Sequence, residues 1–600
     1  MNHTFHIPVL GLGYSVDTPL KVARYGISSV VSIVDDELCE RMRKFHSEKN
    51  NLPYTLIKKE EPDSRAKRIT AYLNLLHILV TAAFSALAQE DFAAGTEINT
   101  YFDFLPENSS LKKAYEQMLA LPDGEAKKYR QEDLRAKMKA GNIDVNIMSK
   151  VDKANYTKDN EHEGNDFTDA LAAMRGFANS SLGSSVIISA GLNPRLYTYM
   201  ENCADFYPNR FGDIKKKITL KVSDYRSALI QAKMLAKKGL WVSEFRVESG
   251  LNCGGHAFAT EGLLLGPILE EFKQKRTELH SELAAIYHAA LSAKDISTTV
   301  ATTLKITAQG GIGTFEEHEF LLNYYALDAT GWGSPFLLVP EATNVDEQTM
   351  ESLATATADD YYVSNSSPLG VLFNNFRKST MEEQRLQRIE KGRPGSPCVK
   401  KFLSTNTEFT ELPICTASRE YQNLKIKELE QMELSAAAFT EKFDTITEKI
   451  CLCEGLCSST YIKHGLLKPK ESPAVSICPG PNLAYFSRQY SLKEMISHIY
   501  GRESISFKTL RPNLFVNELN LYIDYLKKDL NAQINELSVK KTKYFEKFTD
   551  QLFNGINYYK DLIPELKLQT DLAAQELRHQ LSVAEEKLMS IAKDLNLAIA

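Results

Sequence analysis

The stretch Leu304–Ala342 constrains the fold more than any other part of this sequence, because it reads as strand, glycine turn, helix, strand and second glycine turn. Apolar residues alternate over 304–308, as in a short strand. The first turn is 310–313 (GGIG), Thr314 can cap the following helix, and the second turn is 331–334 (GWGS). Two consecutive parallel strands that each end in glycine leave backbone N–H groups free to bind an anion.

The last two strands of a β/α barrel often form a phosphate site of this kind. Here the two turns contain Gly310, Gly311, Gly333 and Ser334, and Gln309, a further candidate for cofactor binding, directly precedes the first turn. Glycine also serves turns for conformational reasons alone, which is the alternative interpretation.

Earlier segments repeat the strand pattern and alternate with helical ones: Ile7–Leu12, Ile27–Val34, Ile143–Met148, Ser185–Ala190, Lys217–Val222 and Leu240–Val247. With the two strands of 304–342 they number about eight, which is the number that closes a TIM (β/α)8 barrel. Periodicity alone also allows an open doubly wound sheet. We therefore predict an α/β protein built on a TIM barrel.

The remaining segments predict additions to this barrel. The barrel is expected to span 1–380, with a charged, mostly helical insertion at about 36–141. A cysteine-rich extension follows at 381–510 and a helical region at 511–600, in which Pro564 separates two long helices. The apolar stripe of the first is Leu519, Ile523, Leu526, Leu530, Ile534 and Leu537.

Composition excludes several protein classes. The 600 residues are 43% hydrophobic and 25% charged, with a net charge of −6, so nucleic-acid binding is not expected. The first residues lack a basic and an apolar signal region, and we expect a cytoplasmic protein. Residues 69–89 carry no formal charge and approach membrane-spanning length, but Asn74 and His77 interrupt them, which favours an amphipathic helix and no membrane contact.

The loop at 250–256 (GLNCGGH) follows the sixth strand. Gly254 and Gly255 allow the backbone to approach a flat ligand closely. His256 can act as a general base at neutral pH. A loop histidine without chemistry is the alternative.

Three motifs, at 250–256, 309–312 (QGGI) and 333–336 (GSPF), resemble the nitronate monooxygenase (2-nitropropane dioxygenase) family. The related enoyl reductases of polyunsaturated fatty acid synthases share the pattern, and the resemblance extends over residues 7–342 without the insertion. These proteins are FMN-binding TIM barrels.

The resemblance implies a role for each matching residue. Gly310, Gly311, Gly333 and Ser334 would bind the FMN phosphate, Gly11 would lie beside the isoalloxazine ring, and Asn146 would hydrogen-bond the flavin. His256 would take a proton from the carbon next to the nitro group. The family usually has Ala at the position of Cys253 and Thr at that of Ser334. Lys221 ends the fifth strand, where it can meet phosphate or reduced flavin, or stay solvated.

Four of the nine cysteines, Cys451, Cys453, Cys457 and Cys478, lie close together in the sequence. Closely spaced thiols suit a metal site, and an iron–sulfur cluster is favoured over zinc because a flavin can use an electron relay. Unligated, buried thiols are the alternative.

The sequence thus predicts an FMN-dependent oxidoreductase that oxidises a carbon acid, such as an alkyl nitronate, with oxygen. One alternative is an NAD(P)H-linked flavin reductase of an unsaturated acyl substrate with an iron–sulfur relay. Another is a non-catalytic assembly subunit. The C-terminal helices could pair two copies of the chain into a homo-oligomer.

Overall fold

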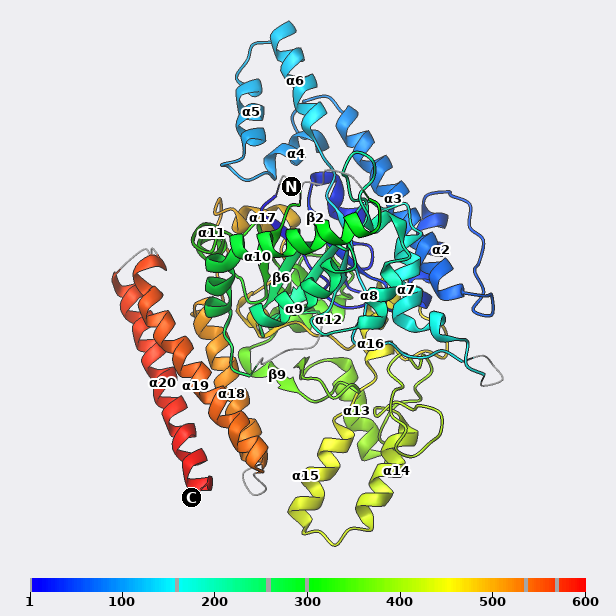
Figure 1. Ribbon diagram of the computed structural model, residues 1–600, viewed down its shortest axis with the longest axis vertical. Coiled ribbons are helices and arrows are strands. Elements are labelled where there is room, and N and C mark those ends of the chain that lie inside the picture. The colour runs from blue at the N-terminus through cyan, green and yellow to red at the C-terminus, as the bar shows by residue number, and fades with distance from the viewer. Residues whose placement is uncertain are drawn as a thin grey trace.

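The computed structural model describes residues 3–156, 161–254, 261–296, 302–533, 538–566 and 571–599, with side chains up to Leu595 in the last range. Figure 1 shows a central barrel from which two helical hairpins and a bundle of three C-terminal helices extend.

Eight parallel strands close into a barrel in the order in which they occur along the chain. The last strand pairs with the first through Thr330–Phe5 and Gly331–His6. The strands are β1 (Phe5–Ile7), β2 (Ser28–Ser32), β3 (Ile143–Asn146), β4 (Ser185–Ile188), β5 (Lys217–Val222), β6 (Val242–Glu248), β7 (Lys305–Gln309) and β8 (Ala329–Gly331). The TIM barrel is confirmed, and closure excludes the open doubly wound sheet.

The first strand lies earlier in the chain than its apolar pattern predicts. It spans Phe5–Ile7, whereas the sequence indicated Ile7–Leu12. Pro8 has no N–H to donate to a strand ladder, so regular pairing ends before it. The apolar residues Val9 and Leu10 are nevertheless buried, in irregular backbone that leads to Gly11.

The interior of the barrel is polar over much of its depth. Arg246 Nη2 of β6 lies 4.0 Å from Asp144 Oδ2 of β3, across an interior that two intervening strands enclose. Glu244 pairs with Arg246 at 2.8 Å and accepts a hydrogen bond from Thr307 Oγ1 at 2.7 Å. A small separate apolar cluster consists of Val9, Val30 and Ile187. Branched apolar side chains usually fill such barrels, so this interior is a departure from the norm.

Helices cover the outside of the barrel. They are α1 (Thr18–Val22), α7 (Asp169–Ala178), α8 (Pro194–Met200), α9 (Tyr225–Ala236), α10 (Leu265–Ala293) and α11 (Phe315–Tyr324). Short 3-10 helices connect elements at Ala23–Tyr25, Asn165–Phe167, Ala204–Phe206, Ser334–Leu338, Ala358–Asp360, Pro481–Tyr485 and Ile563–Leu566.

Between β2 and β3 the chain forms helices α2 (Asp36–Lys49), α3 (Ser64–Gln89), α4 (Glu97–Asp103), α5 (Ser110–Leu119) and α6 (Glu125–Lys137). By length and composition α3 could cross a membrane, and it is the one such helix in the part of the chain that is described. One face of α3 packs on α2 and α7 and buries Ile69 and Tyr72. On the opposite face Ile78 is 57% exposed, so α3 is amphipathic here.

After the barrel the chain forms α12 (Glu347–Thr355), a two-stranded antiparallel sheet of β9 (Tyr361–Ser364) and β10 (Phe373–Phe376), and helices α13 (Thr380–Glu390), α14 (Arg419–Glu430), α15 (Ala436–Thr447), α16 (Leu452–Lys463) and α17 (Leu492–Ile499). The α14–α15 hairpin projects from one end of the molecule, opposite α5 and α6 (Figure 1).

The C-terminal region contains one more long helix than the sequence pattern indicates. Its helices are α18 (Leu514–Gln533), α19 (Val539–Leu562) and α20 (Asp571–Ile599). Helix α18 contains Leu519, Ile523, Leu526 and Leu530 of the predicted stripe, and α19 starts after Ser538, whose side chain accepts a hydrogen bond from Lys541 N. Ile534 and Leu537 lie outside the described residues.

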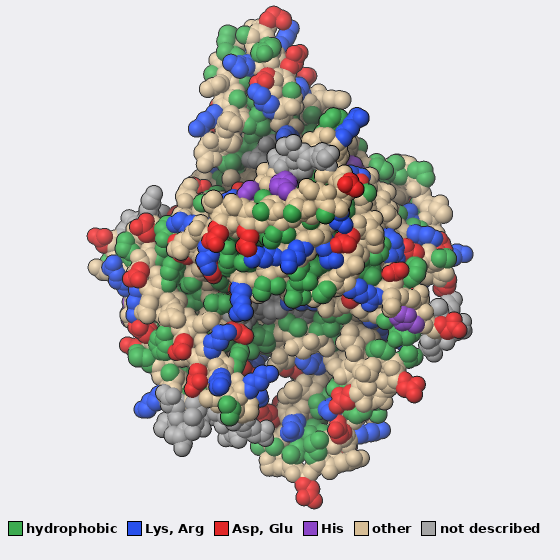
Figure 2. All heavy atoms as spheres, in the orientation of Figure 1, with side chains coloured by type: hydrophobic (Ala, Val, Ile, Leu, Met, Phe, Trp, Pro, Cys, Tyr) green, Lys and Arg blue, Asp and Glu red, His purple; other side chains and the backbone are tan. Residues whose placement is uncertain are grey.

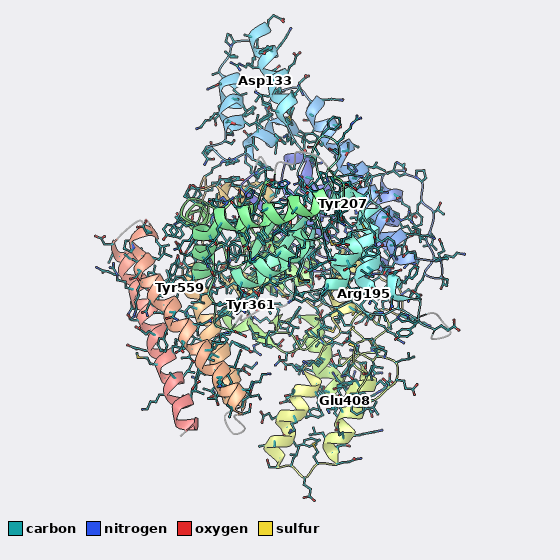
Figure 3. All side chains as sticks on the ribbon, in the orientation of Figure 1. Asp133, Arg195, Tyr207, Tyr361, Glu408 and Tyr559 are labelled. Carbon is teal, nitrogen blue, oxygen red and sulfur yellow. The ribbon has the colours of Figure 1, made fainter. Side chains whose placement is uncertain are left out.

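Packing of this bundle on the barrel uses aromatic side chains. Tyr559 of α19 stacks on Phe515 of α18 with ring centroids 4.9 Å apart, and its hydroxyl accepts from Gly266 N of α10 (Figure 3). Space-filling atoms show Lys and Arg mixed with Asp and Glu over the visible face, without a patch of one sign (Figure 2).

Candidate active site at the carboxyl end of the barrel

Four polar side chains meet where β5, β6 and β7 end. Glu248, the last residue of β6, pairs with Lys221 Nζ of β5 at 3.2 Å. Its Oε1 also accepts hydrogen bonds from Asn252 Nδ2 and Gln309 Nε2, each at 2.8 Å. Carboxyl ends of strands carry the chemistry in TIM barrels, so this group lies where an active site is expected.

One buried oxygen atom in this group, Asn252 Oδ1, has no hydrogen-bond partner within the described structure. Gln309 instead lies close enough to His6 for a side-chain hydrogen bond. A buried polar atom without a partner costs free energy and usually marks an unseen ligand or water. Asn252 Oδ1 is an acceptor, so it suits a ligand that carries an N–H group.

The glycine turns after β7 and β8 border the same group. Gly310 and Gly311 have φ angles of +105° and +77°, a conformation that disfavours other residues. A Cβ on Gly310 would lie 2.9 Å from Asn252 N, and a Cβ on Gly333 would lie 2.7 Å from Cys253 Sγ. Among the described residues, the N–H groups of these three glycines find no hydrogen-bond acceptor. The structure thus brings both turns to the loop that follows β6.

This loop crosses the mouth of the barrel toward β1. A Cβ on Gly254 would lie 2.0 Å from Val9 O, so only glycine fits there. Burial raises the pKa of the Cys253 thiol, with the charge of Cys478 adding to the effect, and Cys253 therefore stays protonated. Gly255 and His256 lie outside the described residues, so the proposed base is not placed.

Gly11 and Asn146 are less closely connected to this group. Gly11 packs on the ring of Tyr14, which a Cβ would meet at 2.6 Å. Asn146 ends β3, is half-buried, and its backbone carbonyl accepts from Ile33 N. Within the described ranges, no hydrogen bond joins Gly11 or Asn146 to the glycine turns.

Lys150 is a residue of the mouth that sequence reasoning missed. Desolvation lowers its pKa to about 8, and the positive charge of Lys221 contributes in the same direction. An ammonium group that can lose its proton near neutral pH suits acid–base chemistry. The sequence could have pointed to Lys150, because it follows the end of β3 by four residues and residues after strand ends lie at the mouth of the barrel.

Segments from far along the chain cover the glycine turns. The sequence did not reveal these long-range contacts. Arg511 Nη2 donates to Gly311 O at 2.6 Å and Arg511 Nη1 pairs with Glu317 at 2.7 Å. Asn482 Nδ2 donates to Ile312 O at 3.1 Å. The region before α18 therefore helps to form the mouth of the barrel.

The four cysteines that the spacing grouped together do not form one site. Cys457 Sγ donates to Asp35 Oδ2 at 3.3 Å, and the carbonyl oxygen of Cys478 accepts from Gly254 N at 3.1 Å. Cys451 and Cys453 instead adjoin Cys398 and Cys415. Spacing along the chain did not decide these partners, since Cys453 and Cys457 lie one turn apart on α16 and yet contact different segments of the chain. In the part of the chain that is described, no three or more His, Cys, Asp or Glu side chains are placed to hold a metal ion.

A cavity of about 310 Å³ opens at the opposite, amino-terminal end of the barrel. Its lining includes His6, Asp144, Arg246, Lys217 and Lys305. Burial raises the pKa of Asp144 to about 6 and lowers that of His6 to about 3. Such polar cavities accommodate water or a small polar molecule, and no sequence motif pointed to this one.

Comparisons with known proteins add little. No family model matches the chain, and no curated protein matches it. Several solved structures are similar to it in part, among them the following two. The enoyl reductase domain of MlnA from the macrolactin biosynthesis cluster of Bacillus amyloliquefaciens is 13% identical, with a TM-score of 0.32 over 66% of this chain and 86% of that one. FabK from Thermotoga maritima is 12% identical, with a TM-score of 0.29 over 66% of this chain and 88% of that one. Likeness at this level carries no argument about function.

The groups at the mouth are of the kinds that bind FMN, since the N–H groups of the glycine turns suit a phosphate and the buried Asn252 Oδ1 suits an N–H of a flavin ring. Lys221 supplies a cation beside them. Other side chains fill the space beside the turns in this structure: a Cβ on Gly311 would lie 2.5 Å from Leu251 and 2.7 Å from Leu514, and one on Gly333 would lie 2.7 Å from Cys253 Sγ. These side chains would have to move for FMN to bind.

Proposed function

We propose that this chain is a flavin-dependent oxidoreductase that binds FMN at the carboxyl end of its barrel. The observation that carries the proposal is the buried Asn252 Oδ1, which has no partner within the described structure, beside glycine turns whose N–H groups are unpaired. Gly310, Gly311, Gly333 and Ser334 would bind the phosphate, and Gln309, Asn252 and Lys221 would contact the ring. A bound flavin would accept electrons from the substrate.

The polar side chains at the mouth can stabilise negative charge in a substrate. Lys221 and Lys150 present ammonium groups there, and Glu248 fixes Lys221 through the 3.2 Å ion pair. A carbon acid that loses a proton becomes an anion, which these cations stabilise. We propose a nitroalkane, oxidised as its nitronate anion, or a similar carbon acid as substrate, with oxygen as the oxidant and His256 as the base that removes the carbon-bound proton.

The test is FMN binding by two lysine variants on one strand. Lys221→Met removes the cation at the mouth, and we expect FMN affinity to fall at least about tenfold, because charge-assisted contacts are the strong ones. The matched control is Lys217→Met, since Lys217 stands on the same face of β5 at the other end of the barrel and is exposed. Fluorescence titration of purified full-length protein measures both affinities.

The outcomes separate the candidate activities. Bound FMN with nitronate-dependent oxygen uptake supports the proposal. Consumption of NAD(P)H with an unsaturated acyl substrate, without oxygen uptake, would replace the oxidase with a reductase. Protein that neither contains nor takes up FMN would exclude both enzymes and leave an assembly role.

A further inference from the structure

The cavity at the amino-terminal end of the barrel is bordered by the first residues of several strands, among them Ser28 of β2, Ser185 of β4 and Lys305 of β7. Its volume of about 310 Å³ lies at the lower end of the range for small-molecule sites. Roughly ten water molecules, or a ligand with a similar number of non-hydrogen atoms, would fill this volume. Asp213 and Thr303, which also line the cavity, are exposed, so a small molecule can enter from the end of the barrel opposite the glycine turns.

Arg246 lines this cavity and uses only one edge of its guanidinium group within the protein. Its Nε donates to Glu244 Oε1 at 2.8 Å, and its Nη2 lies 2.8 Å from the same oxygen. The other edge, formed by Nη1 and Nη2, has no hydrogen-bond acceptor among the described residues, although the side chain is only 3% exposed. An edge with two parallel N–H groups matches the two oxygens of a carboxylate.

Asp144 supplies an acceptor beside this unused edge. Its Oδ1 accepts from Ser185 N at 3.2 Å, whereas its Oδ2 lies 4.0 Å from Arg246 Nη2, which is too far for a hydrogen bond. Burial raises the pKa of Asp144 to about 6, so the carboxylate is still mostly charged at neutral pH. A ligand can therefore place a carboxylate on Arg246 and an ammonium group on Asp144. An α-amino acid carries these two groups on one carbon atom.

The rim of the cavity adds two ammonium groups. Lys217 and Lys305 begin β5 and β7, and in the described part of the chain neither Nζ has an ion pair or a hydrogen bond. The carboxylate at the rim is that of Asp213, which is exposed. Trp241 forms an apolar part of the wall, and its indole is fixed by a hydrogen bond from Nε1 to Thr303 O at 2.9 Å. Two free cations beside an apolar surface suit a short side chain that ends in an acid.

We propose that this cavity binds a free α-amino acid with an acidic side chain, such as glutamate or aspartate. The α-carboxylate binds the unused edge of Arg246, and the α-ammonium group binds Asp144 Oδ2. The side-chain carboxylate binds Lys217 and Lys305 at the rim. The site lies at the other end of the barrel from the glycine turns and rests on no assumption about FMN.

Isothermal titration of the purified full-length chain with L-glutamate and with L-aspartate tests this proposal. We expect a dissociation constant below about 1 mM for at least one of them. Glutarate lacks the ammonium group and L-lysine has the opposite side-chain charge, so each should bind at least about tenfold more weakly. Absence of binding of both acidic amino acids at about 10 mM would leave the cavity to water and overturn the proposal. Glutarate binding as tight as that of glutamate would also overturn it.

Two variants test the predicted contacts. Asp144→Asn keeps an acceptor for Ser185 N but removes the charge, and it should weaken glutamate binding at least about tenfold. Lys305→Met should weaken it at least about threefold. The matched control is Lys215→Met, because Lys215 is 48% exposed, pairs with Asp205 and does not line the cavity. Unchanged glutamate affinity in Asp144→Asn would contradict the proposed site.

A measurement on the wild-type protein covers variants that fail to fold. Residues 212–214 line the cavity, so bound glutamate should slow their amide hydrogen exchange at least about threefold. The α14–α15 hairpin lies outside the barrel and should exchange at an unchanged rate. Binding of glutamate without added protection at 212–214 would place the ligand elsewhere and overturn the proposal.

Discussion

Glu518 is a buried carboxyl group that links α18 to the barrel. It is 1% exposed and accepts hydrogen bonds from Ser249 Oγ at 2.6 Å and Leu265 N at 2.7 Å. Burial raises its pKa from 4.5 to about 7, because the charged form loses its hydration. The sequence did not indicate that Glu518 is buried, because glutamate on a helix is mostly exposed.

The raised pKa predicts a pH-dependent stability. Between pH 4.5 and about 7 the folded state holds a proton that the unfolded state has released, so stability falls as pH rises through this window. The total effect is roughly 3 kcal/mol. Glu518→Gln should flatten this dependence, whereas Glu546→Gln, an exposed position on α19, should retain it. Urea unfolding at pH 5 and pH 8 measures both, and an unchanged slope in Glu518→Gln would contradict the assignment.

At the scale of elements, one buried ion pair holds the start of α18 against α11. Arg511 and Glu317 pair at 2.7 Å with side chains 3% and 6% exposed. Glu317 also accepts hydrogen bonds from Gly313 N and Leu514 N. This carboxylate therefore joins the turn after β7, the helix α11 and the C-terminal region.

Arg511→Met leaves the Glu317 carboxylate buried without its cation. Breaking a buried pair in this way should destabilise the protein by about 3–5 kcal/mol. The control is Lys547→Met, which removes an ion pair between α19 and Glu261 whose side chains are 57% and 55% exposed. Exposed pairs contribute at most about 1 kcal/mol. Urea unfolding measures both losses of stability. Equal losses in Arg511→Met and Lys547→Met would show that the buried pair does not stabilise the fold more than the exposed one.

At the scale of the whole molecule, stability should differ between the barrel and its appendages. Helices α5 and α6 bury only Lys112, Tyr115, Met118 and Leu134. Regions with few buried contacts open more readily than a barrel core. Amide hydrogen exchange should therefore be at least about tenfold faster in α5 and α6 than in β3 to β6, as mass spectrometry of peptic peptides can measure. Comparable protection would mean that another surface covers this hairpin.

The sequence by itself determined the alternation of strands and helices and the positions of the glycine turns, whereas closure of the sheet into a barrel was decided by the tertiary structure. Strand periodicity and turn chemistry are local, so Lys217–Val222 and the turn after Gln309 were readable without the fold. Two boundaries differ from the apolar pattern for local reasons: Pro8 ends β1 early, and Ser538 begins the additional helix α19.

Only the tertiary structure decided which distant residues meet. Arg511 reaches the turn at Gly311, and Cys398 and Cys415 pack in the same small core as Cys451. The partners of these groups lie tens to hundreds of residues away, and their spacing along the chain carries no information about contact in space. The polar barrel interior was likewise decided by the tertiary structure. Alternation along a strand shows which residues share a face, but only closure of the sheet decides which face lines the interior.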